Sequence, residues 1–151
     1  MMRILLAVTL VIAALGAAEE GVRLEIAFAV PPHAEGSVRA ALFSDEESFD
    51  DWKDPVRSVV LPLEDEALEE GLLVWKPEAL PAGTYALLAF QDLNGDGVLN
   101  LDERGRPTEP FTASGRMGRG GPRFRRAAME LDAGEHCVEI SDWRMRKAQD
   151  Q

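Results

Sequence analysis

The residues from Asp92 to Glu103 form the part of the sequence whose types and spacing most clearly predict chemistry. They match D-x-[DN]-x-[DN]-G-x5-E at every specified position, which is the pattern of a calcium-binding loop. Calcium takes roughly six to eight oxygen ligands, and alternate residues of a coiled loop can turn their oxygens toward one point. The expected ligands are Asp92, Asn94, Asp96, Val98 (through its carbonyl), Asn100 and Glu103.

A polar turn without metal is the alternative for this loop. Asn94-Gly95 and Asp96-Gly97 are dipeptides typical of hairpins, so they could simply reverse the chain. A turn does not need an acid at the twelfth position, and this favours calcium as a structural cofactor. The loop would depart from the usual helix–loop–helix context, because a strand is predicted before it and Pro107 follows it closely. We expect a modest dissociation constant of about 0.1–1 mM.

The segment 104–126 carries positive charge in an otherwise acidic chain. Residues 19–103 have a net charge of −15, whereas 104–126 contain seven arginines and one acid, Glu109. A long ordered loop rich in arginine can hold phosphate or carboxylate groups. Two alternatives stay open: the segment pairs with the acidic part of the chain, or it is mobile. The arginines considered for anion binding are Arg116, Arg119, Arg123, Arg125 and Arg126.

The other residues with chemical potential are few, and they exclude several functions. One cysteine cannot form a disulfide within the chain, and two histidines leave no Cys/His zinc site. The formal charge of −11 argues against nucleic-acid binding, which needs a positive surface. We expect His33 and His136 to be structural and Cys137 to be a small buried residue, with a reactive thiol as the alternative. We therefore expect no catalytic residues and no enzymatic activity.

Residues 1–18 have the layout of a secretory signal peptide. Arg3 gives a positive start, residues 4–15 are apolar, and small residues precede two glutamates. The apolar run is shorter than the roughly 20 residues of a membrane-spanning helix, and no cysteine follows it for a lipid anchor. A buried N-terminal helix is the alternative. We expect cleavage after Ala18 and an exported protein, periplasmic or extracellular, that is not lipid-anchored and has no transmembrane segment.

The elements that must position these residues follow a period of two. Residues 22–30 alternate between apolar and polar side chains, and 85–91 form a nearly continuous apolar run typical of a central strand. Seven short strands without a long helix indicate an all-β fold, a single antiparallel β-sandwich of transthyretin-like or immunoglobulin-like type. The expected strands are 22–30, 38–42, 56–63, 72–76, 85–91, 127–131 and 136–141.

The predicted domain organisation is one sandwich after the signal peptide. The domain covers 19–141 and includes the calcium-type loop 92–103 and the long Arg/Gly-rich loop 104–126. Ser44 and Glu47 have the spacing of a capping box, which predicts a short helix or turn over 44–52. Residues 142–151 lack an apolar pattern and are expected to be a flexible tail.

Several segments together resemble a family of exported bacterial proteins, the domain of unknown function family 2141. Residues 80–85 (Leu-Pro-Ala-Gly-Thr-Tyr) and 89–99 carry the resemblance. Residues 105–111 are similar to the family's G-x-P-x-E segment, 120–127 to its G-P-P-S-F-E-D-A segment, and 38–49 more weakly. The resemblance implies a small secreted β-sandwich of transthyretin-like or carboxypeptidase-regulatory-like shape, without an established activity.

The chain departs from the family pattern at two places. Arg125 and Arg126 stand where members usually have Glu-Asp, so an acidic role at that spot is in doubt. Many members lack an acid at the position of Glu103, which favours calcium binding in this chain more than in the group.

These observations predict an exported, non-catalytic and monomeric module. Calcium bound by the loop 92–103 would order 104–126 for interaction with an envelope or extracellular protein or glycan. A carbohydrate or anionic-ligand binding protein is the alternative, with Trp52, Trp75 or Phe111 as stacking surfaces and 92–103 only a structural turn. A hydrolase is less favoured.

Overall fold

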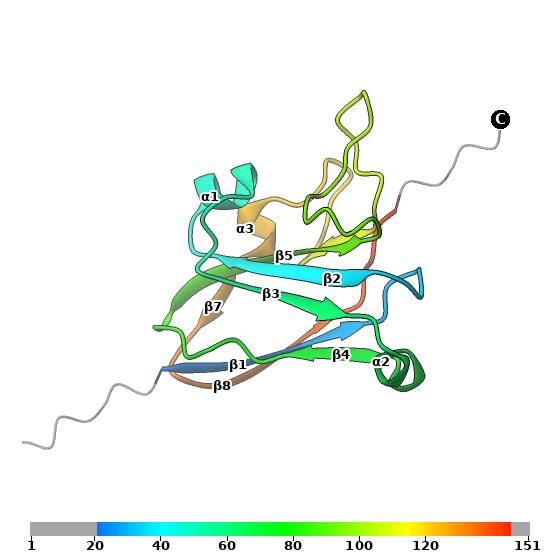
Figure 1. Ribbon diagram of the computed structural model, residues 1–151. Coiled ribbons are helices and arrows are strands. Elements are labelled where there is room, and N and C mark those ends of the chain that lie inside the picture. The colour runs from blue at the N-terminus through cyan, green and yellow to red at the C-terminus, as the bar shows by residue number, and fades with distance from the viewer. Residues whose placement is uncertain (1–20, 146–151) are drawn as a thin grey trace, which may run out of the picture.

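The computed structural model describes residues 21–145 as a β-sandwich of two sheets (Figure 1). The smaller sheet has the order β4-β1-β8, and the larger has the order β3-β2-β5-β6, with β7 also paired to β5. The predicted all-β sandwich is confirmed. The strands are β1 Val22–Ala29, β2 Ser37–Phe43, β3 Arg57–Pro62, β4 Leu72–Trp75, β5 Gly83–Asp92, β6 Phe111–Ala113, β7 Met129–Leu131 and β8 Gly134–Ile140.

All but one of the strand pairs are antiparallel. The exception is β1 with β8, which run parallel from Val22 opposite Gly134 to Phe28 opposite Ile140. This differs from the purely antiparallel sheets that the sequence predicted. A parallel pair needs a long connection rather than a hairpin, and here almost the whole domain lies between the two strands.

The strand β5 is buried on both faces, as its apolar run predicted. One face joins the core between the sheets through Tyr85, Leu87 and Ala89. The other face lies beneath α1 (Glu46–Asp51) and α3 (Phe124–Ala127), where Leu88 belongs to a second apolar cluster. The end of β5 is therefore a fixed position from which the loop at Asp92 begins.

Four short elements differ from the sequence-based predictions. The strand β6 lies inside the segment that we expected to be one long loop, and α3 occupies the start of the predicted strand 127–131. The acidic residues between β3 and β4 form the helix α2 (Asp65–Glu70). The helix α1 begins one residue later than expected, because Asp45 rather than Ser44 caps it through a hydrogen bond from the Ser48 backbone N–H.

Residues 143 and 144, which the sequence predicted to lie in a flexible tail, are held by hydrogen bonds. Trp143 donates its indole N–H to the Ala29 carbonyl at 2.7 Å, and Arg144 exchanges backbone hydrogen bonds with Phe111. These contacts fix residues that we had assigned to a flexible segment starting at 142. The predicted signal peptide and residues 146–151 lie outside the described residues. Within 21–145, no helix is long and apolar enough to cross a membrane.

Candidate functional site

The carboxylate of Asp92 forms the base of the calcium-type loop. It is buried at the end of β5 and accepts hydrogen bonds from the backbone N–H groups of Gly95 at 2.8 Å and Gly97 at 2.9 Å. Its Oδ2 also accepts a hydrogen bond from Arg39 Nε at 2.6 Å. Gly95 and Gly97 have φ angles of 75° and 78°, a region that glycine adopts without steric cost. The hydrogen bonds to Asp92 thus turn the loop back toward the end of β5.

The side chains of Asn94, Asp96 and Asn100 converge above this base. The Asn94 amide donates to Asp96 Oδ2 at 3.1 Å and to Asn100 Oδ1 at 2.9 Å, and the Asn100 amide donates to Asp96 Oδ2 at 2.8 Å. The hydrogen bond from Asn100, followed by that from the Val98 backbone N–H, lowers the pKa of Asp96. Asp96 therefore stays ionised, and its carboxylate accepts hydrogen bonds from the amide groups of Asn94 and Asn100 and from the Val98 backbone N–H.

The structure does not bring Glu103 to this cluster. Residues 101–107 form a small hairpin in which the Leu101 and Pro107 backbones pair, and Glu103 lies exposed in its turn. The neighbouring Asp102 accepts hydrogen bonds from the backbone N–H groups of Arg104 and Arg106, at 2.9 and 3.0 Å. Glu103, the twelfth position of the pattern, is thus part of a second turn. The hydrogen bonds of Asp102 hold this turn in place.

A different acid, Glu109, closes the loop. Its buried carboxylate accepts hydrogen bonds from the backbone N–H groups of Leu93 at 2.9 Å and Asn100 at 3.1 Å. The two ends of the loop are thereby held by one side chain. We did not single out Glu109 as a site residue, although it was the only acid among the seven arginines of 104–126.

The available donors fit a weak cation site. Asp92 and Asp96 offer carboxylates, Asn94 and Asn100 offer amide oxygens, and the Val98 carbonyl accepts no hydrogen bond from residues 21–145. Arg39 already offsets the charge of Asp92. Over the same range, no group of three or more His, Cys, Asp or Glu side chains could hold a metal. Because calcium affinity rises with the number of charged ligands, this set favours the millimolar end of the expected range.

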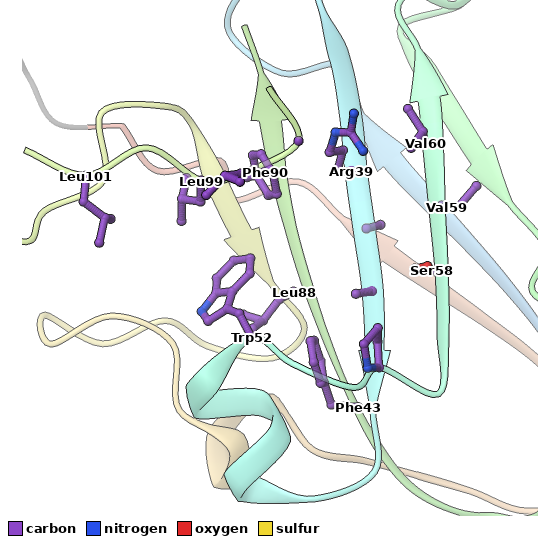
Figure 2. A pocket seen from close by; sticks show the side chains of 15 residues that line it. Arg39, Phe43, Trp52, Ser58, Val59, Val60, Leu88, Phe90, Leu99 and Leu101 are labelled. Carbon is purple, nitrogen blue, oxygen red and sulfur yellow. The ribbon is translucent and has the colours of Figure 1, made fainter. Parts of the chain in front are cut away.

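A groove of about 650 Å³ lies between the loop and the larger sheet (Figure 2). It is on the face of β2, β3 and β5 that points away from the smaller sheet. Figure 2 shows Leu101, Leu99 and Phe90 in a row near the Trp52 ring, with Arg39 on β2 beyond Phe90. Arg39 is the one charged side chain among the described residues that line the groove. The loop that could hold a cation is therefore also a wall of an apolar groove.

The backbone at one rim of this groove is strained. Trp52 ends α1 with φ 54° and Asp54 has φ 51°, and they are the only non-glycine residues within 21–145 with positive φ. A left-handed conformation costs an L-residue roughly 1–2 kcal/mol, which is why glycine is the usual choice there. The helix α2 ends in the usual way, with Gly71 at φ 71°. Of the three aromatic residues considered as stacking surfaces, Trp52 lines the groove, Trp75 is buried in the core and Phe111 is half-buried beside the second cluster.

The five arginines considered for anion binding are not gathered into one site by the structure. Arg125 lies 4.0 Å from Glu46, and the guanidinium of Arg126 lies against Gly118. Arg119 lines a small hollow of about 300 Å³ together with Arg106 and Arg144. The last two are ion-paired, Arg106 with Asp102 and Arg144 with Asp142. Within 104–126, Arg106 and Arg125 are the arginines that lie within 4.0 Å of a carboxylate oxygen.

The histidines and the cysteine lie apart from the loop and the groove. The His33 ring contacts the Met145 sulfur at 3.3 Å, and His136 Nε2 lies 2.8 Å from the Asp132 carbonyl. Cys137 is exposed on β8, which corrects our expectation of a buried residue. The strand β8 lies in the smaller sheet, where alternate side chains face solvent, and Cys137 falls in the outward register.

A comparison with family models is consistent with this architecture. Residues 30–139 match the model of a family described as uncharacterized protein conserved in bacteria, domain of unknown function 2141. The chain belongs to this family. The match covers the calcium-type loop, the groove and Glu109, and it confirms the resemblance seen in the sequence. No match was found among curated proteins or among solved structures.

Proposed function

We propose that this member of family 2141 is an exported, non-catalytic module that binds calcium through its loop 92–103. The convergence of Asn94, Asp96 and Asn100 above the buried Asp92 carboxylate carries the proposal. The loop gathers four polar side chains, those of Asp92, Asn94, Asp96 and Asn100. Export rests on the sequence of residues 1–18 alone.

Calcium would act by ordering the segment that comes after the loop. Asn100 accepts hydrogen bonds from the Thr108 backbone and side chain at 2.9 and 3.1 Å, and Glu109 links the loop to β6. A cation held by Asn100 would therefore stiffen residues 104–110 and, beyond them, the Arg/Gly-rich segment. That segment would then present a fixed surface to an envelope or extracellular protein or glycan.

Thermal unfolding of residues 19–151 in EDTA and in about 5 mM calcium tests this proposal. With a dissociation constant of about 0.5 mM, linkage predicts a stabilisation of about 1.4 kcal/mol. A domain of this size should then unfold about 3–5 °C higher. Magnesium at the same concentration is the ionic-strength control, and it should give a smaller shift because it dehydrates reluctantly.

Two exposed acids in the same loop provide a matched pair of variants. Asp96→Ala should abolish the calcium shift, whereas Glu103→Ala removes the same charge and should keep it, because Glu103 lies outside the cluster. Asp92 is less suitable, because its carboxylate also holds Arg39 and two backbone groups. Equal calcium shifts in both variants, or none in the unaltered protein, would contradict the proposal.

A further inference from the structure

The groove beside the calcium-type loop has the size and the lining of a small-molecule site, which is concave and mostly apolar with few polar groups. We propose that it binds a small amphipathic carboxylate, with the apolar body against Trp52 and Phe90 and the carboxylate at Arg39. This proposal goes beyond calcium binding and does not depend on it. Glu109 and Asp92 hold the loop wall in place through hydrogen bonds within the chain.

The aromatic rim supports an apolar body. The rings of Trp52 and Phe90 meet edge to face with their centroids 6.1 Å apart, and the Trp52 ring stays partly exposed. Trp52 packs part of its ring against the second apolar cluster and leaves the rest at the groove, in a left-handed helix end that glycine would fill without strain. Strained residues gather at binding sites, where the surrounding structure holds them for what their side chains contact. The part of the Trp52 ring that stays exposed can contact the apolar body of a ligand.

The loop side of the groove is also apolar and open. Val98 is 61% exposed and Leu101 is 56% exposed, and both line the groove together with Leu99. Exposed apolar side chains that border a concave surface mark a ligand site more often than isolated ones do. A ligand body placed here would remove apolar surface from water on three sides.

Arg39 supports a carboxylate as the polar end of the ligand. Its Nε is taken by Asp92, but its Nη1 and Nη2 make no hydrogen bond with any residue of 21–145, and its side chain is 33% exposed. The guanidinium lies beside Gly97, with its central carbon 3.4 Å from where a Cβ would stand. Planar N–H donors of this kind match a carboxylate. A sugar fits less well, because the described lining offers only Arg39, Ser58 and the Trp52 indole N–H as polar side-chain groups.

Isothermal titration of the protein in EDTA with decanoate and, separately, with 1-naphthoate tests the site. Binding of either compound supports the proposal. The compound that binds more tightly shows whether the apolar body of the ligand is aliphatic or aromatic. Binding of neither at millimolar concentration would overturn it. Decanol should bind about tenfold more weakly than decanoate if Arg39 holds the carboxylate. Equal binding of the two would overturn the assignment of the polar end.

Matched variants locate the binding. Leu101→Ser and Leu72→Ser make the same change at two exposed leucines, one in the groove wall and one on β4 of the other sheet. Only Leu101→Ser should weaken binding. Trp52→Gly should fold, because glycine suits the left-handed cap, and should bind at least about tenfold more weakly. Unchanged affinity in Trp52→Gly, in a variant whose thermal unfolding stays cooperative, would overturn the site.

Discussion

At the scale of single residues, each acid near the loop has its own set of donors and therefore its own role. Asp92 and Glu109 are buried and hold backbone N–H groups, while Asp96 is exposed and holds two amide side chains. Acids of the same charge thus take different roles: Glu109 is structural, Asp96 is a candidate cation ligand, and Asp92 holds backbone groups while its carboxylate also borders the cation site. Burial and the number of backbone donors decide which is which.

We predict that the turn held by Asp102 is sensitive to acid. Hydrogen bonds, led by that from the Arg106 backbone N–H, lower the pKa of Asp102 from 3.8 to about 2. Because the folded-state pKa lies below the unfolded one, the stabilisation is complete above about pH 4 and is lost as the pH falls through about 2. An NMR titration of the Asp102 carboxyl carbon should give a midpoint near 2, and amide exchange at Arg104 should accelerate over the same range. A midpoint near 3.8 would contradict this role.

At the scale of elements, the loop 92–103 is held by a partner from outside its own sequence. Glu109 comes from the connection to β6 and fastens both loop ends, while the Asp92 carboxylate fixes the first turn. The loop is thereby fastened at both ends to the connection that leads into β6, and at its first turn to the end of β5. These hydrogen bonds also hold the groove wall at 98–101.

We predict that Glu109→Gln weakens this element. The amide oxygen of glutamine can accept a hydrogen bond from one of the two backbone N–H groups. The amide NH₂ then faces the other N–H group, and this buried donor loses its acceptor. The expected loss in free energy of unfolding is about 1–3 kcal/mol. Urea denaturation measures it, and Glu103→Gln is the matched control, with an expected change within about 0.5 kcal/mol. Equal effects of the two changes would contradict the role of Glu109.

At the scale of the whole molecule, the parallel pair of β1 and β8 closes the fold. The first and last strands of the domain lie side by side over seven register positions, and Trp143 then fixes the chain to Ala29. Folding therefore joins residues more than a hundred positions apart. The smaller sheet depends on β8, because β1 otherwise has only the short β4 as a neighbour.

We predict a strong contrast between two positions on β8. Ile140→Ala opens a cavity in the core between the sheets and should destabilise the protein by about 2–5 kcal/mol. Cys137→Ala changes an exposed side chain on the same strand and should alter stability by less than about 0.5 kcal/mol. Differential scanning calorimetry of both variants measures the contrast. A similar loss at Cys137 would show that this side chain is packed rather than exposed.

The sequence by itself determined the class of fold and the course of β5 into its loop. Alternation of apolar residues is a local signal with the period of a strand, and the continuous apolar run 85–91 marked the strand that is covered on both sides. The glycines at 95 and 97 and the alternate Asp and Asn residues predicted the winding of the loop, because each of these effects acts within a few residues. The short helices α2 and α3 were missed, since elements of one turn or two carry little periodicity.

Only the tertiary structure decided which acid closes the loop, how the chain ends pair and where the groove lies. Glu109 reaches the loop from a segment whose composition suggested only charge, and Glu103 is held in a second turn by its neighbours. The parallel pairing of β1 with β8 and the contact of Trp52 with Phe90 join residues that are distant in sequence. Such contacts depend on the packing of whole sheets, and the pattern along a single strand contains no information on which strand will lie beside it.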